Sequence, residues 1–151
     1  MKNTAFVLVS CLMIWSCNFS DKTKSTTSNN EQTKDEIELS SELKESMQRG
    51  AEVYNDLCVT CHLPNGKGVP ESFPPLANSD YLMNNRIKSI KAIKYGLSGE
   101  IKVNGEIYNT TMAAFGLTDA EVADVMNYIT NSWGNKNLSL ITEKEVSQIK
   151  P

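Results

Sequence analysis

Two cysteines and a histidine stand close together in the sequence Cys58-Val-Thr-Cys61-His62. Two thiols at this spacing, followed directly by an imidazole, suit three kinds of chemistry: a structural metal site, a thiol–disulfide pair, or covalent attachment of a haem. In the third case both thiols bond to one edge of the porphyrin, and the imidazole becomes a ligand of the iron. The surrounding residues distinguish these possibilities.

The first two possibilities lack the partners that they need. A structural zinc site has four ligands, but His62 is the sole histidine, and the other cysteines, Cys11 and Cys17, lie near the N-terminus. A thioredoxin-type pair lies between a strand and a helix, whereas here helix-like sequence precedes the motif and a loop rich in glycine and proline follows it. We therefore predict covalent haem attachment at Cys58 and Cys61, with His62 as an iron ligand.

The N-terminal residues have the pattern of an export signal. Lys2 precedes an apolar run that ends at Trp15, and the small residue Ser16 stands before Cys17. The run is too short to cross a bilayer. We predict a signal peptide over residues 1–16 and a mature protein that is exported to the periplasmic or cell-envelope side.

The residues before Cys17 resemble a lipobox, the site at which a bacterial lipoprotein is cleaved and acylated on a cysteine. Ile14-Trp-Ser-Cys17 contains an unusual tryptophan, while Leu8-Val-Ser-Cys11 fits the lipobox better but leaves too short an apolar run before it. We predict lipidation at Cys17, which would anchor the protein to a membrane. A plain secretory signal and an uncleaved anchor are the alternatives.

A polar segment separates this signal from the rest of the chain. Residues 17–40 consist mainly of Ser, Thr, Asn, Lys, Asp and Glu, a composition that cannot bury enough apolar surface to fold. We predict a disordered tether over residues 17–40 and a single folded domain over residues 41–151. The formal net charge of -3 and the absence of a basic tail argue against nucleic acid as a partner.

Three helices are predicted in the domain from apolar residues that recur every three or four positions. The first runs into Cys58, the second ends before Gly96, and the third lies between a capping box that begins at Thr118 and Gly134. Their apolar positions are, in chain order, Leu43, Met47, Ala51, Tyr54 and Leu57; Ile87, Ile90, Ala92 and Ile93; and Val122, Val125, Met126, Ile129 and Trp133.

Loops rich in glycine and proline are predicted between these helices, one over residues 66–75 and one from Gly99 to Gly116. A further capping-box pattern at Thr142 predicts one or two last helical turns. No strand pattern competes, so the predicted fold class is all-α. Small helices alone form a marginal core, and a buried porphyrin would supply the missing apolar surface.

The order of these residues resembles that of class I monohaem cytochromes c over about residues 42–134. The residues that carry the resemblance are Gly50-Ala-Glu-Val-Tyr54, the motif Cys58-Val-Thr-Cys61-His62, Asn65-Gly66-Lys-Gly68, Phe73-Pro74-Pro75-Leu76, Met112 and Tyr128-Ile129. The resemblance implies small helices wrapped around one covalently bound haem c per chain. It also implies a close crossing of the first and last helices, which Gly50 would permit because it has no side chain.

The resemblance further implies a methionine as the second protein ligand of the iron. Met112 lies in the loop before the last predicted helix, where the family has its axial methionine, and Met83 and Met126 are the alternatives. Ala113 follows Met112 where the family often has proline, so a looser loop is expected. Pro74 aligns with the family proline whose carbonyl accepts the proton of the haem histidine, the alternative being an ordinary loop proline.

Methionine and histidine ligands together favour electron transfer, whereas an open iron favours the binding of small molecules. The resemblance therefore implies an electron carrier between redox proteins such as a respiratory oxidase, reductase or dehydrogenase, with no small-molecule substrate and no enzymatic activity. One alternative is a module that binds nitric oxide or carbon monoxide if Met112 is labile. Another is a fixed electron-transfer subunit of a dehydrogenase or reductase.

The predicted anchor can be checked on the mature N-terminus. We expect mass spectrometry of protein purified from membranes to show that the chain begins at Cys17 and carries a lipid. Substitution of Cys17 by serine should release the protein from the membrane, while Cys11→Ser should leave it there. A mature N-terminus that begins at another residue, or one without a lipid, would contradict the prediction.

Overall fold

Helices α1 (Asn29–Val53) and α5 (Asp119–Ile129) cross closely at Gly50 in the computed structural model, which describes residues 29–151. A Cβ atom added at Gly50 would lie 2.0 Å from the carbonyl oxygen of Asp124 and 2.9 Å from the Cβ atom of Tyr128. Any side chain at this position would therefore force the two helices apart. The predicted close crossing with glycine at the contact is confirmed.

Three aromatic rings pack beside this crossing and form an aromatic cluster of Tyr54, Tyr128 and Trp133. Their centroids lie 5.0 to 5.5 Å apart in tilted and edge-on arrangements, which aromatic pairs prefer. The Tyr54 hydroxyl donates a hydrogen bond to the carbonyl of Leu63 at 2.7 Å, and the Trp133 indole donates one to Pro64 at 3.1 Å. The cluster therefore fixes the start of the loop after His62 against the crossing helices.

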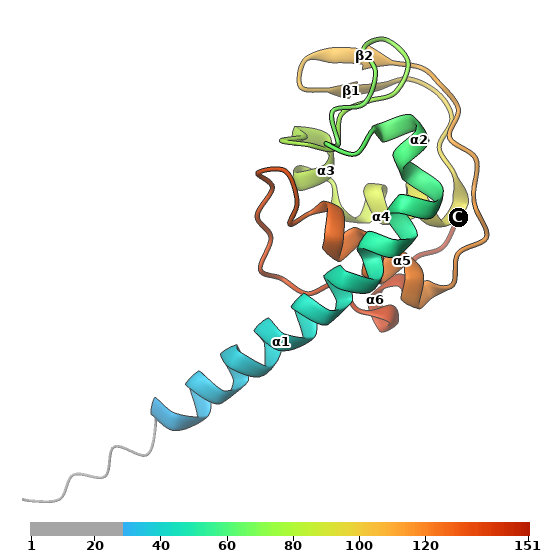
Figure 1. Ribbon diagram of the computed structural model, residues 1–151. Helices are drawn as coiled ribbons and strands as arrows, with labels where there is room; N and C mark the ends of the chain where they lie inside the picture. Colours follow the sequence, from blue (N-terminus) through green and yellow to red (C-terminus); the bar gives the residue numbers. More distant parts are fainter. Residues whose placement is uncertain (1–28) are drawn as a thin grey trace, which may run out of the picture.

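The chain between the crossing helices forms short elements (Figure 1). Helix α1 leads directly into the π-helix η1 (Tyr54–Cys58) and then into α2 (Val59–His62). Next come α3 (Asp80–Asn84) and α4 (Arg86–Tyr95), a hairpin of β1 (Ile101–Val103) and β2 (Glu106–Tyr108), and, after α5, the last helix α6 (Glu143–Gln148). Figure 1 shows the hairpin at the opposite end of the domain from α6.

The helices predicted before Gly96 and after Thr118 are both present as α4 and α5. The capping box is also confirmed: Thr118 Oγ1 accepts a hydrogen bond from the backbone N–H of Glu121, whose carboxylate accepts one from the N–H of Thr118. A hydrophobic core lies between α1, α4, α5 and α6. Its most buried side chains are Tyr54, Ile90, Val122, Val125, Met126, Ile141 and Val146.

The prediction that residues 99–116 form only a loop is wrong. Strands β1 and β2 pair antiparallel, with Ile101 opposite Tyr108. Asn104 and Gly105 join them with φ angles of 51° and 91°, the turn conformation that asparagine followed by glycine favours in a two-residue hairpin. Strands of three residues are too short for an alternating apolar pattern to reveal them. The fold is nevertheless helix-rich, and the all-α class holds.

The helix that leads into the folded domain begins earlier than the sequence predicted. Helix α1 begins at Asn29, so residues 29–40, which were predicted as part of the tether, are helical. This stretch contains no proline or glycine and is rich in Glu, Gln and Lys, which have high helix propensity. The predicted signal peptide, Cys17 and the first part of the tether lie outside the described residues. No helix that the structure describes is long and apolar enough to span a membrane.

Residues 135–151 return along α4 and α5 and are held there by buried polar contacts. Asn127 of α5 is fully buried, donates hydrogen bonds to Ser46 Oγ and to the carbonyl of Ile141, and accepts one from the N–H of Ile141, each at 2.8 Å. Arg86 donates two hydrogen bonds to the carboxylate of Glu145 at 2.6 and 2.7 Å. This pairing lowers the pKa of Glu145. The C-terminal segment is therefore part of the folded domain.

The helix crossing makes position 50 the most sensitive position in α1. We expect Gly50→Ala to lower the free energy of unfolding by about 3 kcal/mol or more, because the new methyl group overlaps a backbone carbonyl that cannot move away easily. Urea denaturation followed by circular dichroism on the purified protein measures this. As a control, Glu52→Ala on the exposed face of α1 should change the stability by less than about 0.5 kcal/mol. Equal stabilities of the two variants would contradict the crossing.

Candidate functional site

A cavity of about 1180 Å³, a volume that includes open solvent at its mouth, lies between α2, α4, the hairpin and the loops that follow His62 and Tyr108. Cys58, Cys61 and His62 all line it. Most of its other wall residues are apolar: Leu57, Phe73, Pro74, Pro75, Leu76, Leu82, Ala92, Ile93, Leu97, Ile101, Val103, Met112, Ala113, Phe115, Val125 and Ile129. A cavity of this size and polarity suits a large apolar ligand.

The two cysteines lie at the junction of η1 and α2. Cys58 is the last residue of the π-helix, and Cys61 stands three residues later in α2, a spacing that places side chains on the same face of a helix. Both thiols are free of disulfides. Burial, with a smaller effect of the neighbouring Cys61, raises the pKa of Cys58 to about 11. Reactive disulfide-exchange cysteines have lowered pKa values, the opposite of the direction at Cys58.

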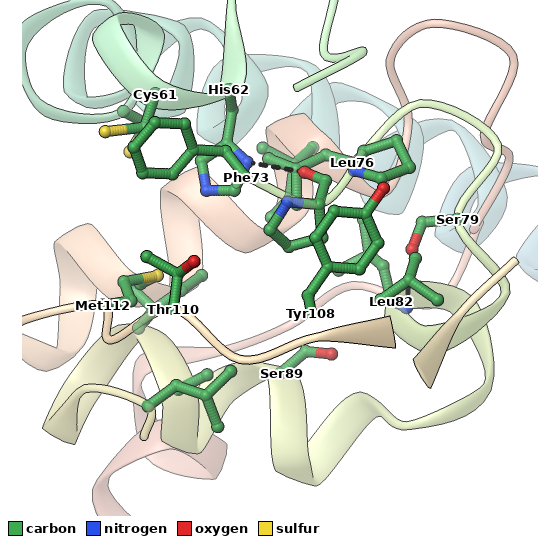
Figure 2. A pocket seen from close by; sticks show the side chains of 18 of the residues that line it. Cys61, His62, Phe73, Leu76, Ser79, Leu82, Ser89, Tyr108, Thr110 and Met112 are labelled. Carbon is green, nitrogen blue, oxygen red and sulfur yellow. Dashed lines mark hydrogen bonds between the residues drawn. The ribbon is translucent and has the colours of Figure 1, made fainter. Parts of the chain in front are cut away.

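His62 projects into the cavity with its ring held from one side. Its Nδ1 atom lies 3.0 Å from the carbonyl oxygen of Pro74 (Figure 2). Because a carbonyl can only accept, Nδ1 carries the proton and the lone pair of Nε2 is free to bind a metal. Burial lowers the pKa of His62, an effect that the hydrogen bond to Pro74 partly opposes, and this favours the neutral form that ligates metals. Pro74 thus lies where its predicted role requires, although the role itself remains a prediction.

Two glycines allow the loop to bring Pro74 to the histidine. Gly66 and Gly68 have φ angles of 65° and 61°, which residues with side chains rarely adopt. A Cβ atom at Gly68 would lie 2.2 Å from the carbonyl oxygen of Phe73 and 2.6 Å from that of Pro74, and one at Gly66 would lie 2.4 Å from the ring of Trp133. The loop can therefore fold tightly under the histidine only with glycine at both positions.

Met112 lines the cavity on a different wall from His62 (Figure 2). Its backbone pairs with Leu97, just beyond the end of α4, through two hydrogen bonds of 2.8 Å each. This backbone pairing restrains the loop, although Ala113 follows Met112 where the family often has proline. The pairing of Leu97 with Met112 could not be predicted from the sequence, because backbone hydrogen bonds leave no pattern in the side chains.

Among the methionines that the structure describes, Met112 alone lines this cavity. Met126 is fully buried in the core, and Met83 packs against that core outside the cavity. Tyr108 lines the cavity as well. Five of the predicted site residues are therefore brought together at one cavity: Cys58, Cys61, His62, Pro74 and Met112.

The residues present fit a haem. The thiols that would hold its edge, an imidazole with a free nitrogen and a thioether all face one apolar space. Among the side chains of residues 41–151, which the structure describes, no cluster of three or more His, Cys, Asp or Glu could hold a metal ion directly. The cysteine pair is therefore not part of a structural zinc site among these residues.

Comparisons with known proteins agree with this geometry. The model of the cytochrome c family matches residues 47–133. Cytochrome c-552 of Thermus thermophilus is 38% identical over 110 residues, which cover 67% of this chain and 83% of that protein.

Subunits of dehydrogenases are also similar to this chain. The cytochrome c subunit of the quinone alcohol dehydrogenase of Gluconobacter oxydans is 30% identical over 104 residues, which cover 67% of this chain and 22% of that subunit. The cytochrome c subunit of the gluconate 2-dehydrogenase of Pantoea cypripedii is 35% identical over 107 residues, covering 68% and 24%. The chain belongs to the cytochrome c family and is an electron-transfer protein with one haem c bound covalently at the motif formed by Cys58, Cys61 and His62.

Proposed function

We propose that this protein carries single electrons between redox proteins on the exported side of a bacterial membrane, with His62 and Met112 as the two protein ligands of the haem iron. The observation that carries the proposal is that His62 and Met112 lie on different walls of one cavity that also holds both cysteines. The bound haem supplies an iron that changes its oxidation state by one electron.

The protein contributes apolar walls and hydrogen bonds that restrain both ligand residues. The hydrogen bond from Nδ1 to Pro74 keeps the proton away from Nε2 of His62 and fixes the ring, which also strengthens the imidazole as a ligand. On the other side, the backbone hydrogen bonds between Leu97 and Met112 restrain the loop that carries the thioether. Because both ligands are restrained and the walls are apolar, little rearrangement accompanies a change of charge at the iron.

The same restraint argues against a sensor of nitric oxide or carbon monoxide. Such a module requires a ligand that leaves the iron readily, whereas the backbone of Met112 is fixed to Leu97. We also propose that the protein is not itself an enzyme. Among the described residues of the cavity, no second histidine, aspartate or glutamate is available as an acid or base beside the iron.

Two kinds of relative bear on the partner. One group comprises cytochromes c-552 and the other comprises cytochrome subunits of dehydrogenases. We propose a shuttle, because the similarity to the cytochromes c-552 extends over most of their length. We propose further that a lipid on Cys17 holds it at the membrane. Co-purification with a dehydrogenase or reductase in a fixed ratio would favour a subunit instead.

Replacement of Met112 tests the proposed ligand directly. The unmodified protein should show a low-spin spectrum, a near-infrared band typical of methionine bound to ferric haem, and no rapid binding of carbon monoxide when reduced. Met112→Ala should lose that band and bind carbon monoxide rapidly, because the sixth position of the iron becomes open. Absorption spectra of the oxidised and reduced proteins provide the measurement.

Met83→Leu is the matched control, since Met83 is partly buried but lies outside the cavity. It should retain the band. Loss of the band in Met83→Leu and not in Met112→Ala would show that Met83, and not Met112, is the iron ligand. An open iron in the unmodified protein would favour the sensor.

Replacement of Gly68 tests the contribution of Pro74. In Gly68→Ala the added methyl group would displace the carbonyl of Pro74 and weaken its hydrogen bond to His62. A histidine that has lost this acceptor is a weaker donor to the iron and stabilises the oxidised state less, so we expect the reduction potential to rise. Redox titration followed by absorption measures the potential.

Gly116→Ala serves as the control for backbone strain. Gly116 also has a positive φ, of 71°, but a Cβ atom there meets nothing within 4 Å. It should leave the potential unchanged. Equal shifts in both variants would show that strain, and not the displaced carbonyl, is responsible.

A further inference from the structure

Ser89 of α4 carries a hydroxyl group that the protein leaves without a partner. The residue is 5% exposed and lines the cavity, and its Oγ atom makes no hydrogen bond to any of the residues that the structure describes. A buried hydroxyl without a hydrogen bond destabilises a fold. The missing partner is therefore expected in whatever fills the cavity.

Ser89 lies far from the cysteines within that cavity. Figure 2 shows Cys61 at the upper left of the space and Ser89 at its lower edge. Along α4, Ser89 stands six residues before Tyr95, the last residue of the helix, a distance of about 9 Å. Met112 is paired with Leu97 beyond that end. Ser89 is therefore also remote from the proposed methionine ligand.

The chemistry of a haem supplies a partner at this position. Its vinyl groups, which bond to the cysteines, and its two carboxylates lie on opposite edges of the porphyrin. A haem joined to Cys58 and Cys61 thus directs its carboxylates toward the wall opposite the cysteines, and these are its only strong hydrogen-bond acceptors. Ser89 is a donor on that wall.

The charges around the cavity make such a donor important. None of its described lining residues is Lys, Arg, Asp or Glu. The titratable groups that line it are Tyr54, Tyr81, Tyr108, His62 and the two cysteines. A buried carboxylate needs hydrogen bonds to remain ionised, and here hydroxyl groups line the wall in place of cations.

We propose that the hydroxyl of Ser89 donates a hydrogen bond to a carboxylate of the haem and favours its ionised form. This inference rests on the proposed placement of the haem at Cys58 and Cys61. It adds Ser89 to the residues that hold the cofactor. It also gives Ser89 an effect on how the reduction potential depends on pH, because a carboxylate that ionises near the iron stabilises the oxidised state.

The test compares Ser89→Ala with Ser89→Thr, which keeps the hydroxyl group, in the haem-loaded protein. The potential is titrated as a function of pH. Removal of the donor disfavours the ionised carboxylate, so in Ser89→Ala the pH range over which the potential falls should move upward, corresponding to an acid about tenfold weaker. Ser89→Thr should remain close to the unmodified protein. The vibrational bands of the haem carboxylates, read by resonance Raman spectroscopy, should also shift in Ser89→Ala only.

Ser46→Ala is the matched control, because Ser46 is equally buried but hydrogen-bonds to Asp124 between α1 and α5, outside the cavity. It should lower thermal stability without moving the potential curve. The inference is overturned if the dependence of the reduction potential on pH is unchanged in Ser89→Ala. In that case, a rise in stability would indicate that the hydroxyl has no partner, and a fall would indicate that it binds water. The α-band of each variant shows separately whether haem is attached. A failure of the proposed function can therefore be distinguished from a failure of the inference about Ser89.

Discussion

The contact between α1 and α5 is the constraint on which the rest of the fold depends. With no side chain at Gly50, the two helices approach until a backbone carbonyl of α5 touches α1. This crossing fixes the direction in which α1 leads into η1 and α2, and so fixes the positions of the two cysteines and His62. It also places Tyr128 and Trp133 beside Tyr54, where they hold the start of the next loop.

The remaining chain surrounds a space that its own side chains do not fill. Helix α4 and the hairpin form walls, and the loop after His62 closes beneath the imidazole because Gly66 and Gly68 adopt conformations that other residues avoid. The apolar side chains on these walls have no protein partner across the cavity. Their burial is completed by the cofactor, so haem attachment and the stability of this half of the domain are coupled.

Much of this arrangement could be predicted from the sequence, because the informative signals are local. The motif from Cys58 to His62 identifies the attachment site, Thr118 and Glu121 mark the start of α5, and Gly50 marks the helix crossing. The hairpin was missed because its strands are only three residues long, although Asn104 and Gly105 gave a turn signal. The early start of α1 was missed because a polar composition indicates weak burial but does not prevent a helix from continuing.

Other features could not be predicted because they depend on three-dimensional proximity. The backbone pairing of Leu97 with Met112 leaves no trace in side-chain types. The position of Ser89 against the cavity depends on how α4 is rotated about its axis, and an isolated serine between charged and apolar residues gives no indication of burial. The network around Asn127 joins residues from both ends of the domain, which no local pattern specifies.

That network affects how the chain reaches its folded state. Ile141 and Val146, from the last residues of the sequence, are among the most buried side chains of the core, and Asn127 obtains two of its hydrogen bonds from Ile141. The core therefore closes only when the C-terminal segment has docked onto α4 and α5. A variant truncated before Ile141 would lack both the apolar side chains that fill this part of the core and the partner of Asn127.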